Sequence, residues 1–401
     1  MASPDTFDTV IVGLGAMGSS ALYHLASRGV TVLGVDRYVT PHTHGSTHGR
    51  TRIIREAYYE HPGYVPIVQR AYELWASLEK RIGEPLFVQT GGLMIGPPEG
   101  ELFAGALRSA TEHGLAHMIL GPSETNARFP GFRVPAGSMA LHEPRAGLLF
   151  PEKCVEAHLS LARRAGATIR SGVTVTGWKA DDGLRIETDA GELRARTLIL
   201  AAGPWLPALV PDLALPLEVE RQLFHWFEPA SHPEWYDAAH SPISLIEYAD
   251  GRFFATFPDV GHGVKAGIHH EGAIIDIDAP RAPASAAEGA ELQALLARYL
   301  PQAAGRILDR ATCVYTNTPD HDFLLDRHPA HPNVIIASPC SGHGFKFASA
   351  VGEILADMVT TGETSFDLAP FALSRLLPRE ANQPDRIEPE ASRGHARPVQ
   401  H

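Results

Sequence analysis

The sequence is poor in cysteine, in positive charge and in long apolar runs. Three cysteines in 401 residues are too few for a disulfide framework, so we expect a reducing, cytoplasmic setting. No apolar run approaches the ~18 residues that span a membrane, and no secretory signal is predicted at the start of the chain. The formal net charge of −12 disfavours nucleic acid and anionic membrane surfaces as partners.

The rest of the composition is that of an ordinary globular protein. Hydrophobic residues make up 44% of the chain and charged residues 20%. A chain of 401 residues can bury a large core and form two domains.

The strongest pattern lies in residues 7–36. An apolar run leads into Gly13, Gly15 and Gly18, spaced as G-x-G-x-x-G, and a helical pattern and a second apolar run follow, ending at Asp36. The glycines allow a tight turn, close approach of a pyrophosphate and close packing of the helix, whose N-terminus favours phosphate. An acid at the end of the second strand is placed to bind a ribose hydroxyl. The pattern therefore predicts dinucleotide binding, without separating FAD from NAD; a glycine turn in an α/β unit without a ligand is the alternative.

A polar loop follows this unit, over residues 37–61. It lies just past the carboxyl end of the second strand and should face the nucleotide crevice, so Ser46 and His48 are candidate cofactor contacts. His44 and His48 are four residues apart, a spacing that could hold a metal ion on a helix. Glycines interrupt any helix here and no cysteine is near, so no metal is predicted.

For several charged side chains and thiols, a structural role is the simplest interpretation. Arg52 and Arg55 are three residues apart and would share a helix face, with ion pairing as the default role of Arg55. Cys154 and Cys313 lie in apolar surroundings that favour buried thiols. Lys265 lies within a small, apolar strand, where it is either a surface residue or, if buried, a pointer to function.

Periodicity predicts an α/β (α+β two-domain) architecture, with a Rossmann-like domain and a second domain built on an antiparallel sheet. Alternation of apolar and polar residues from 217 to 256 indicates the antiparallel strands. A second glycine-rich turn, at 341–346, precedes a helix whose N-terminus could face the same ligand. The predicted division is 1–85, 145–215 and 310–378 for the dinucleotide-binding domain, 86–144 and 216–309 for the substrate domain, and 379–401 for a disordered tail.

Taken together, these motifs resemble the family of monomeric sarcosine oxidase and N-methyl-tryptophan oxidase, FAD-dependent amine oxidases related to the D-amino-acid oxidase fold. The resemblance covers roughly residues 7 to 375. It rests on the first glycine motif, Pro41-His42 through His48-Gly49, Thr51-Arg52-Ile53-Ile54-Arg55, Cys313-x-Tyr315, Thr318-Pro319-Asp320 and the stretch from Ser341 to Ser349.

The resemblance implies oxidation of an N-methyl amino acid by FAD and O2 to the amino acid, formaldehyde and H2O2, in a monomer. Cys313 corresponds to the covalent flavin attachment site. Arg52 and Lys346 correspond to the pair that grips the substrate carboxylate, Lys265 to the lysine at which oxygen reacts, and His269 to a substrate-pocket histidine. The residues that are expected to contact the cofactor are Gly13, Gly15, Gly18, Asp36, Ser46, His48, Arg52, Cys313, Gly342, Gly344 and Lys346.

Three positions depart from the family pattern. Arg50 stands where an acid is usual, Tyr59 where a glycine is common, and Phe254 where sarcosine oxidases carry a tyrosine at the pocket wall. These departures bear on the substrate more than on the reaction. Other substrates stay open, namely N-methyl-tryptophan, a cyclic imino acid or a glycated amino acid. A non-catalytic dinucleotide-binding protein and an NAD-dependent dehydrogenase are the alternatives from other classes.

Overall fold

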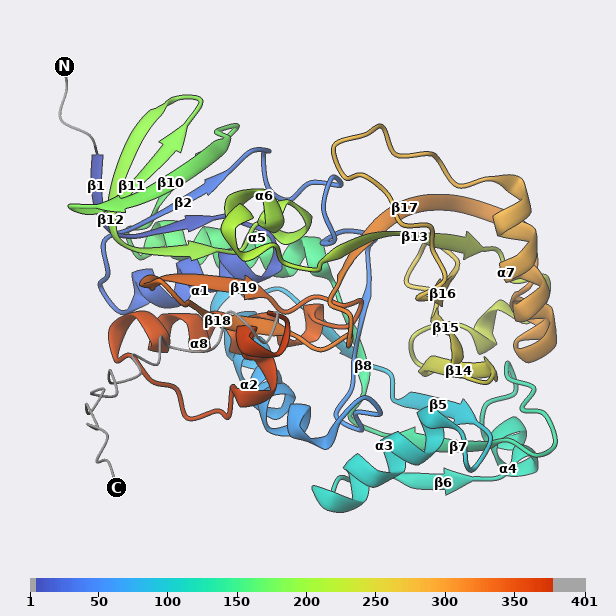
Figure 1. Cartoon of the computed structure of the whole chain (residues 1–401). Helices are drawn as coiled ribbons and strands as arrows, with labels where there is room; N and C mark the ends of the chain where they lie inside the picture. The colour runs from blue at the N-terminus through green and yellow to red at the C-terminus, as the bar shows by residue number, and fades with distance from the viewer. Residues whose placement is uncertain (1–4, 378–401) are drawn as a thin grey trace, which may run out of the picture.

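Two eight-stranded sheets and a small three-stranded sheet organise the protein (Figure 1), seen in a computed structural model that describes residues 5–377. The predicted disordered tail, 379–401, lies outside the described residues. None of the helices within 5–377 combines the length and the apolar character of a membrane span. The mixed α/β architecture confirms the predicted fold class.

The first sheet is built around parallel strands that pair in the order β9-β2-β1-β12, with β19 also parallel to β12. An antiparallel hairpin, β10 and β11, and strand β18 complete it. The strands are β1 (Asp5–Val12), β2 (Val32–Asp36), β9 (Thr168–Ser171), β10 (Val175–Asp181), β11 (Gly183–Thr188), β12 (Gly191–Leu200), β18 (Leu324–His328) and β19 (His331–Ser338).

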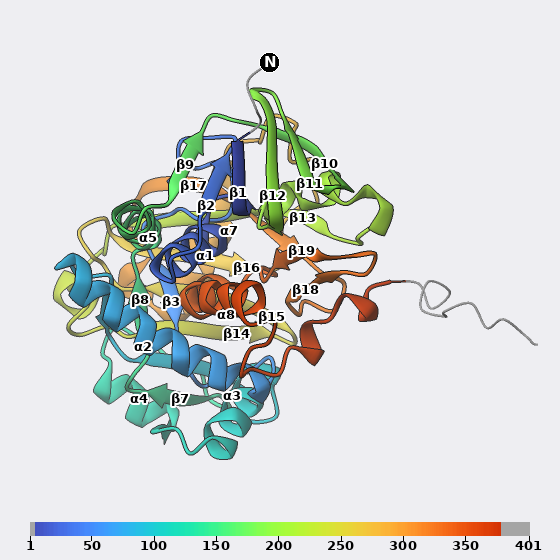
Figure 2. The same ribbon diagram turned by 90° about the vertical axis from the view of Figure 1, so that its left-hand side faces the viewer.

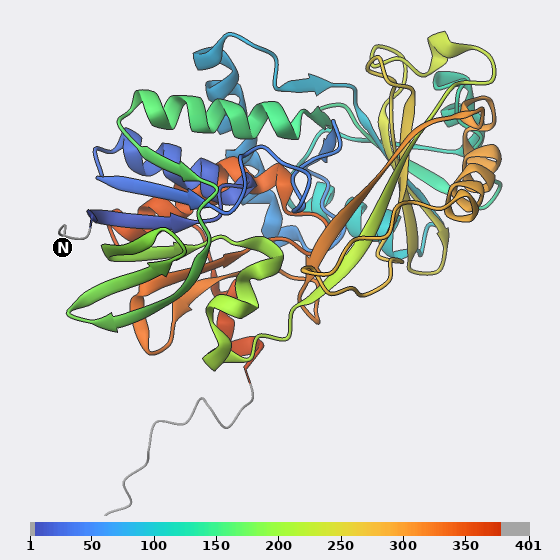
Figure 3. The same cartoon turned by 90° about the horizontal axis from the view of Figure 1, so that it is seen from above.

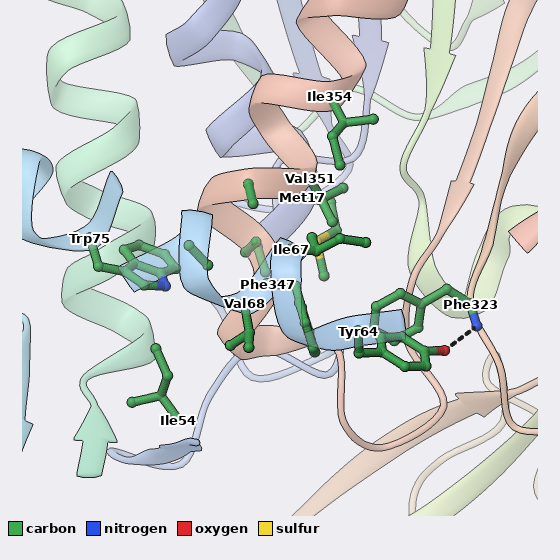
Figure 4. Close-up of a cluster of buried hydrophobic side chains, with 14 of the residues drawn as sticks. Met17, Ile54, Tyr64, Ile67, Val68, Trp75, Phe323, Phe347, Val351 and Ile354 are labelled. Atoms are coloured by element: carbon green, nitrogen blue, oxygen red, sulfur yellow. Dashed lines mark hydrogen bonds between the residues drawn. The ribbon is translucent and has the colours of Figure 1, made fainter. Parts of the chain in front are cut away.

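Helices cover one face of this sheet, where α1 and α8 pack side by side and α2 lies against α8 (Figure 2). Ile11 of β1 points to the helices, whereas Val10 and Val12 point to the opposite face, as the period of a strand requires. Figure 4 shows the core between α2, α8 and Phe323. Tyr64 is buried in this core, and its Oη accepts from the Phe323 N–H at 3.3 Å. The helices on this face are α1 (Ala16–Ser27), α2 (Val65–Ile82), α5 (Pro151–Arg164) and α8 (Ala348–Thr360), whereas the short helix α6 (Leu206–Leu209) packs on the opposite face.

The second sheet has the order β17-β13-β16-β15-β14-β5-β7-β6 and is antiparallel except where β14 meets β5. The long strands β13 and β17, yellow-green and orange in Figure 3, reach back toward the first sheet. Helix α7 (Ala286–Tyr299) packs on the outer face of the second sheet. Its strands are β5 (Gly92–Gly96), β6 (Met118–Leu120), β7 (Met139–Glu143), β13 (Glu218–Phe227), β14 (Ile243–Ala249), β15 (Arg252–Phe257), β16 (Val264–His269) and β17 (Ile307–Asn317).

The small sheet joins β3 (Arg52–Ile54), β8 (Gly147–Leu149) and β4 (Phe87–Gln89). Helices α3 (Glu101–Glu112) and α4 (Pro122–Arg128) pack against the second sheet, α3 on β5 and β7 and α4 on β7. Strand β3 corrects one prediction: Arg52 and Arg55 do not lie on a helix. The sequence division placed residues 310–378 with the first sheet, but β17 pairs with β13 of the second sheet. The two-domain boundaries otherwise stay a prediction.

Candidate active site

A cavity of about 490 Å³ is lined by residues of both large sheets. The first sheet contributes the carboxyl ends of its parallel strands, which is where ligands bind in open α/β folds. The second sheet contributes its inner face. Among the predicted site residues, those that line the cavity are Gly13, Gly15, Asp36, Ser46, Arg52, His269, Gly342, Gly344 and Lys346.

The first glycine motif forms the tight turn between β1 and α1. Gly13 has φ +91°, and a Cβ there would lie 2.5 Å from the carbonyl oxygen of Ala201. A Cβ on Gly18 would lie 1.8 Å from the Gly13 oxygen, so this glycine allows α1 to pack against the turn and does not line the cavity. A Cβ on Gly15 would meet only Thr47, at 3.5 Å. The backbone at Gly15, the N-cap of α1, is therefore open toward the cavity, as a pyrophosphate requires.

Asp36 ends β2 and lines the cavity. Its Oδ2 accepts from the Leu14 N–H and its Oδ1 from the Tyr38 N–H, both at 2.8 Å. Burial pushes the pKa of Asp36 up, but hydrogen bonds from His42, Leu14 and Tyr38 bring the pKa below its usual value. A carboxylate held in this way can accept a further hydrogen bond from a ribose hydroxyl.

The second glycine turn brings Lys346 to the cavity. Gly342 has φ +75°, and a Cβ on Gly344 would lie 1.7 Å from the Pro339 oxygen, so the turn depends on glycine. Lys346 is 5% exposed, and its Nζ donates to the His343 oxygen at 2.6 Å and to Tyr58 Oη at 3.4 Å. Burial, followed by the charge of Arg55, lowers the pKa of Lys346 to about 7.

Arg55 lies beside Lys346, a role that sequence reasoning missed. Its guanidinium group lies 4.3 Å from the centre of the Tyr58 ring, and Lys346 Nζ lies 5.1 Å from the same centre. Nη2 of Arg55 donates to both carboxylate oxygens of Glu60, at 2.8 and 2.7 Å. Arg55, Glu60 and Lys346 all line the cavity, so two buried cations face it together with the carboxylate that pairs with Arg55. The sequence showed Arg55 close to Arg52, but the expected helix gave Arg55 only a structural, ion-pairing role.

Arg52 contacts a different set of residues. Its Nη2 donates to the Ser46 oxygen at 2.8 Å and lies 3.6 Å from Cys313 Sγ. Its guanidinium group lies 4.9 Å from the centre of the Phe224 ring. The predicted carboxylate pair, Arg52 and Lys346, thus shares the cavity, but the charges that act on Lys346 are those of Arg55 and Glu60. The role of Arg52 stays a prediction.

Cys313 and His48 lie behind the cavity wall. Cys313 is fully buried, with Sγ 3.5 Å from the Ser46 oxygen. His48 is 4% exposed, and its Nε2 has no hydrogen-bond partner within the described part of the chain. Burial, followed by the charge of Arg52, lowers the pKa of His48 to about 3. A buried nitrogen without a partner is costly, and a ligand that supplies one would remove the cost.

Lys265 is also buried behind the cavity wall, so it is not a surface lysine. It is 1% exposed, and its Nζ donates to the backbone oxygens of Gly49 and Thr51, both at 2.7 Å. Nζ also lies over the rings of Phe224 at 4.1 Å and Phe257 at 4.5 Å. Burial, and then Arg52, lowers the pKa of Lys265.

His269 lies on the cavity side of β16, 3.0 Å from Tyr315 Oη through its Nδ1. Burial, and then His270, lowers the pKa of His269 far below its usual value, so the ring is neutral. The ring of Tyr315 also lines the cavity, and sequence reasoning had used this residue only as part of a motif. Within residues 5–377, no three His, Cys, Asp or Glu side chains gather to hold a metal ion.

The predicted position of Phe254 is wrong. Phe254 packs on the outer face of the second sheet, 5.5 Å from the ring of Tyr299 on α7, and does not line the cavity. Because side chains alternate along β15, its neighbour Ala255 lines the cavity instead. Tyr59, the other departure, does line the cavity and lies 5.3 Å from the ring of Phe253.

The residues fit a bound FAD. The tight turn at Gly13, which has no room for a Cβ, and the open backbone at Gly15 suit a pyrophosphate. The carboxylate of Asp36 suits a ribose. The unpartnered Nε2 of His48 belongs to the loop whose residues Ser46 and Thr47 line the cavity.

Comparison with known proteins agrees with this fit. The DAO family model, described as FAD dependent oxidoreductase, matches residues 8–358. Monomeric sarcosine oxidase of Streptomyces avermitilis is 39% identical, over 92% of this chain and 98% of the relative. N-methyl-L-tryptophan oxidase of Citrobacter koseri is 37% identical, over 92% of this chain and 99% of the relative. The crystal structure of L-proline dehydrogenase from P. horikoshii has a TM-score of 0.81 at 22% identity, covering 93% of this chain and 98% of that chain, which shows a shared fold. The chain therefore belongs to the family of FAD-dependent oxidoreductases.

Proposed function

We propose that this flavin-dependent amine oxidase demethylates a secondary N-methyl amino acid, with sarcosine as the simplest substrate and O2 as the electron acceptor. One water molecule hydrolyses the oxidised C–N bond, and the products are the primary amino acid, formaldehyde and H2O2. One observation carries the proposal: two buried cations, Arg55 and Lys346, share Tyr58 and face the cavity that the glycine turns line. Buried cations in a cofactor cavity are suited to an anionic substrate group.

The carboxylate site follows from charge. Glu60 neutralises Arg55, so protonated Lys346 leaves one positive charge without a counter-ion in this group. A substrate carboxylate would balance that charge and accept from both side chains. Arg52 stays a second candidate for this role because it also lines the cavity.

The residues near the carboxylate site suit a neutral amine. The buried cations Arg55 and Lys346 disfavour a protonated amine nearby, and His269, which burial and His270 keep neutral, can hydrogen-bond the amine without adding a charge. Tyr315 Oη fixes the His269 ring through Nδ1. The substrate amine must lose its proton before its C–H bond can be oxidised, and we expect the reduction rate to rise with pH.

The cofactor would be held by the two glycine turns, Asp36 and the loop that carries Ser46. When bound, FAD accepts the electrons of the C–N oxidation and passes them to O2. Cys313 is our proposed covalent attachment point, supported by its Sγ lying 3.6 Å from Arg52 and 3.5 Å from the Ser46 oxygen, at the loop that borders the cavity. We also infer that the protein is a monomer, as the names of its sarcosine oxidase relatives state for those proteins.

N-methyl-tryptophan is the second candidate substrate. Relatives that carry the name N-methyl-L-tryptophan oxidase are 37–38% identical over 92% of the chain. Small residues, Ala255 and Gly267, lie in the cavity wall and leave room for a larger side chain.

Oxygen consumption and H2O2 release, measured with sarcosine, N-methyl-tryptophan and L-proline, test the proposal. We expect turnover with an N-methyl amino acid and peroxide formed in equal amount to the oxygen consumed. Turnover with L-proline alone would overturn the N-methyl assignment. Oxygen consumption without peroxide would overturn the assignment of O2 as a two-electron acceptor.

A further inference from the structure

The ammonium group of Lys265 is held by a backbone turn at residues 49–51. Two carbonyl oxygens of the turn accept from Nζ at 2.7 Å, and the Thr51 hydroxyl lies at 3.3 Å. Because Lys265 is 1% exposed, this turn supplies the acceptors that water would otherwise provide. The position of the lysine therefore depends on the position of the turn.

The turn has an unusual backbone. Gly49 has φ +101° and Arg50 has φ +70°, so two successive residues are left-handed and one of them is not glycine. A Cβ on Gly49 would lie 3.0 Å from the Phe224 ring, the same ring that lies under Lys265. A left-handed arginine persists only where its surroundings hold it in place.

Glu152, in the first turn of α5, holds the turn on one side. Its Oε1 accepts from the Gly49 N–H at 2.7 Å and from the Arg50 N–H at 3.1 Å. One carboxylate oxygen thus binds two successive N–H groups of the segment whose carbonyl groups bind Lys265. Its negative charge also favours the ammonium form of Lys265.

Arg50 holds the turn on the other side. Its guanidinium group forms an ion pair with Asp309 and lies 4.4 Å from the centre of the Trp226 ring. Trp226 of β13 pairs with Asp309 of β17 and with Lys265 of β16, so these three residues form one row across three strands. Paired residues share a face of a sheet, and Arg50 therefore docks on the row that contains Lys265. An acid, the usual residue at position 50 in the family that the sequence resembles, would repel Asp309.

We propose that Glu152 and Arg50 are positioning residues for Lys265, which act by clamping the Gly49–Thr51 turn from two sides. The inference rests on the proposed function and on the role that the family resemblance implies for Lys265, which is to promote the reaction of reduced flavin with oxygen. Loosening the clamp should slow flavin reoxidation and leave flavin reduction by the amine much less affected, because neither residue lines the cavity.

The first experiment compares Glu152→Ala with Glu152→Gln in the holoenzyme. Alanine removes the acceptor, whereas glutamine keeps an oxygen for both N–H groups and removes only the charge. We expect reoxidation of the reduced enzyme by O2 to slow by about tenfold or more in the alanine variant, with partial recovery in the glutamine variant. Amide hydrogen exchange of residues 49–50 should speed up in the same order. Glu156→Gln, an exposed residue one turn further along α5, is the control.

The second experiment reverses the ion pair. Arg50→Asp should slow reoxidation even though aspartate tolerates a left-handed backbone better than arginine does. The added substitution Asp309→Arg should restore part of the rate and of the amide protection. Structural damage alone would not be repaired by a charge reversal.

Lys265→Met separates the two proposals. If Lys265→Met does not slow reoxidation, the proposed oxygen role of Lys265 fails and the positioning role fails with it. If Lys265→Met slows reoxidation but Glu152→Ala and Arg50→Asp leave both reoxidation and amide exchange at wild-type values, only the clamp is overturned. Equal loss in reduction and reoxidation would also overturn it, because a positioning role for Lys265 affects one half-reaction.

Discussion

At the residue scale, the chemistry depends on how burial and neighbouring charge set the protonation of a few side chains. Lys346 is the main case, because its pKa of about 7 places it at the edge of protonation in neutral solution. Burial lowers this pKa, and a bound carboxylate would raise it again. Substrate binding and protonation of Lys346 should therefore be coupled.

A carboxylate analogue without an amine tests this coupling. Below pH 7 the free enzyme already carries the Lys346 proton, so affinity should be constant there. Above pH 7 the free lysine is neutral and binding must take up a proton, so the dissociation constant should rise by up to about tenfold per pH unit. Titration with the analogue, followed through the flavin spectrum, measures this dissociation constant at each pH. The dependence should vanish in Lys346→Met, and a dependence that persists there would assign the proton to another group.

A matched pair of substitutions decides between the two arginines. Arg55→Lys and Arg52→Lys both keep a positive charge and lose the planar fork. We expect Arg55→Lys to weaken binding of the carboxylate analogue by about tenfold, the cost of one charge-assisted hydrogen bond. Arg52→Lys should change that affinity less and should lower the fraction of flavin that stays attached after denaturation. The reverse outcome would return the carboxylate role to Arg52, as the sequence predicted.

At the element scale, strand alternation decides which residues reach the cavity. Position 254 shows why the sequence alone was insufficient: its place in the family pattern was clear, but the face of β15 that looks inward was not. The same holds for residues 52–55, where a spacing of three suggested a helix, but Arg52 begins strand β3 and Arg55 follows its end. Asp36, Gly13 and Gly15 were predictable because their geometry is set locally within one β-α-β unit.

Two substitutions in β15 test the assignment of faces. Phe254→Ala should lower the free energy of unfolding by about 3 kcal/mol, because it opens a cavity under α7, and should leave the Michaelis constant for the amine nearly unchanged. Ala255→Phe should raise the Michaelis constant for N-methyl-tryptophan much more than that for sarcosine. Urea unfolding and steady-state kinetics measure these effects. A strong effect of Phe254→Ala on the Michaelis constant with little loss of stability would reverse the faces.

At the scale of the whole molecule, the site joins segments that are far apart in the sequence. Lys346 meets Tyr58, 288 residues away, and Lys265 meets Gly49, 216 residues away. No local pattern encodes such contacts, which is why the fold and the nucleotide turn could be predicted from the sequence but the grouping of Arg55, Glu60 and Lys346 could not. The family resemblance predicted candidate site residues, and the packing of the two sheets determines which of these residues line the cavity.

Buried histidines should make the whole protein sensitive to acid. Burial lowers the pKa of His24 to about 4 and that of His343 to about 3. The unfolded chain takes up protons at these residues below pH 6.5 but the folded chain does not until about pH 4, so each costs up to about 1.4 kcal/mol of stability per pH unit in that window. Glu143, whose pKa burial raises to about 7, acts in the opposite direction as pH falls from 7 to 4.5.

Because His48 and His269 add to His24 and His343, and Glu143 opposes them, we expect a net loss of stability on acidification. Thermal unfolding at pH 7.5, 6.5 and 5.5 in buffers of equal ionic strength measures it. His343 packs near the cavity, so His24→Gln, remote from the site, is the informative variant and should reduce the loss. A melting temperature that rises steadily from pH 7.5 to 5.5 would contradict this account.

The central claim is that a flavin in this cavity oxidises an N-methyl amino acid. The most direct test is an anaerobic titration of the purified protein, with the flavin absorption bands followed as sarcosine and N-methyl-tryptophan are added in parallel. We predict that one of the two bleaches the flavin, and which one does so reports the size of the substrate pocket. A yellow protein that neither compound bleaches would contradict the proposed reaction while leaving the fold and the cofactor in place.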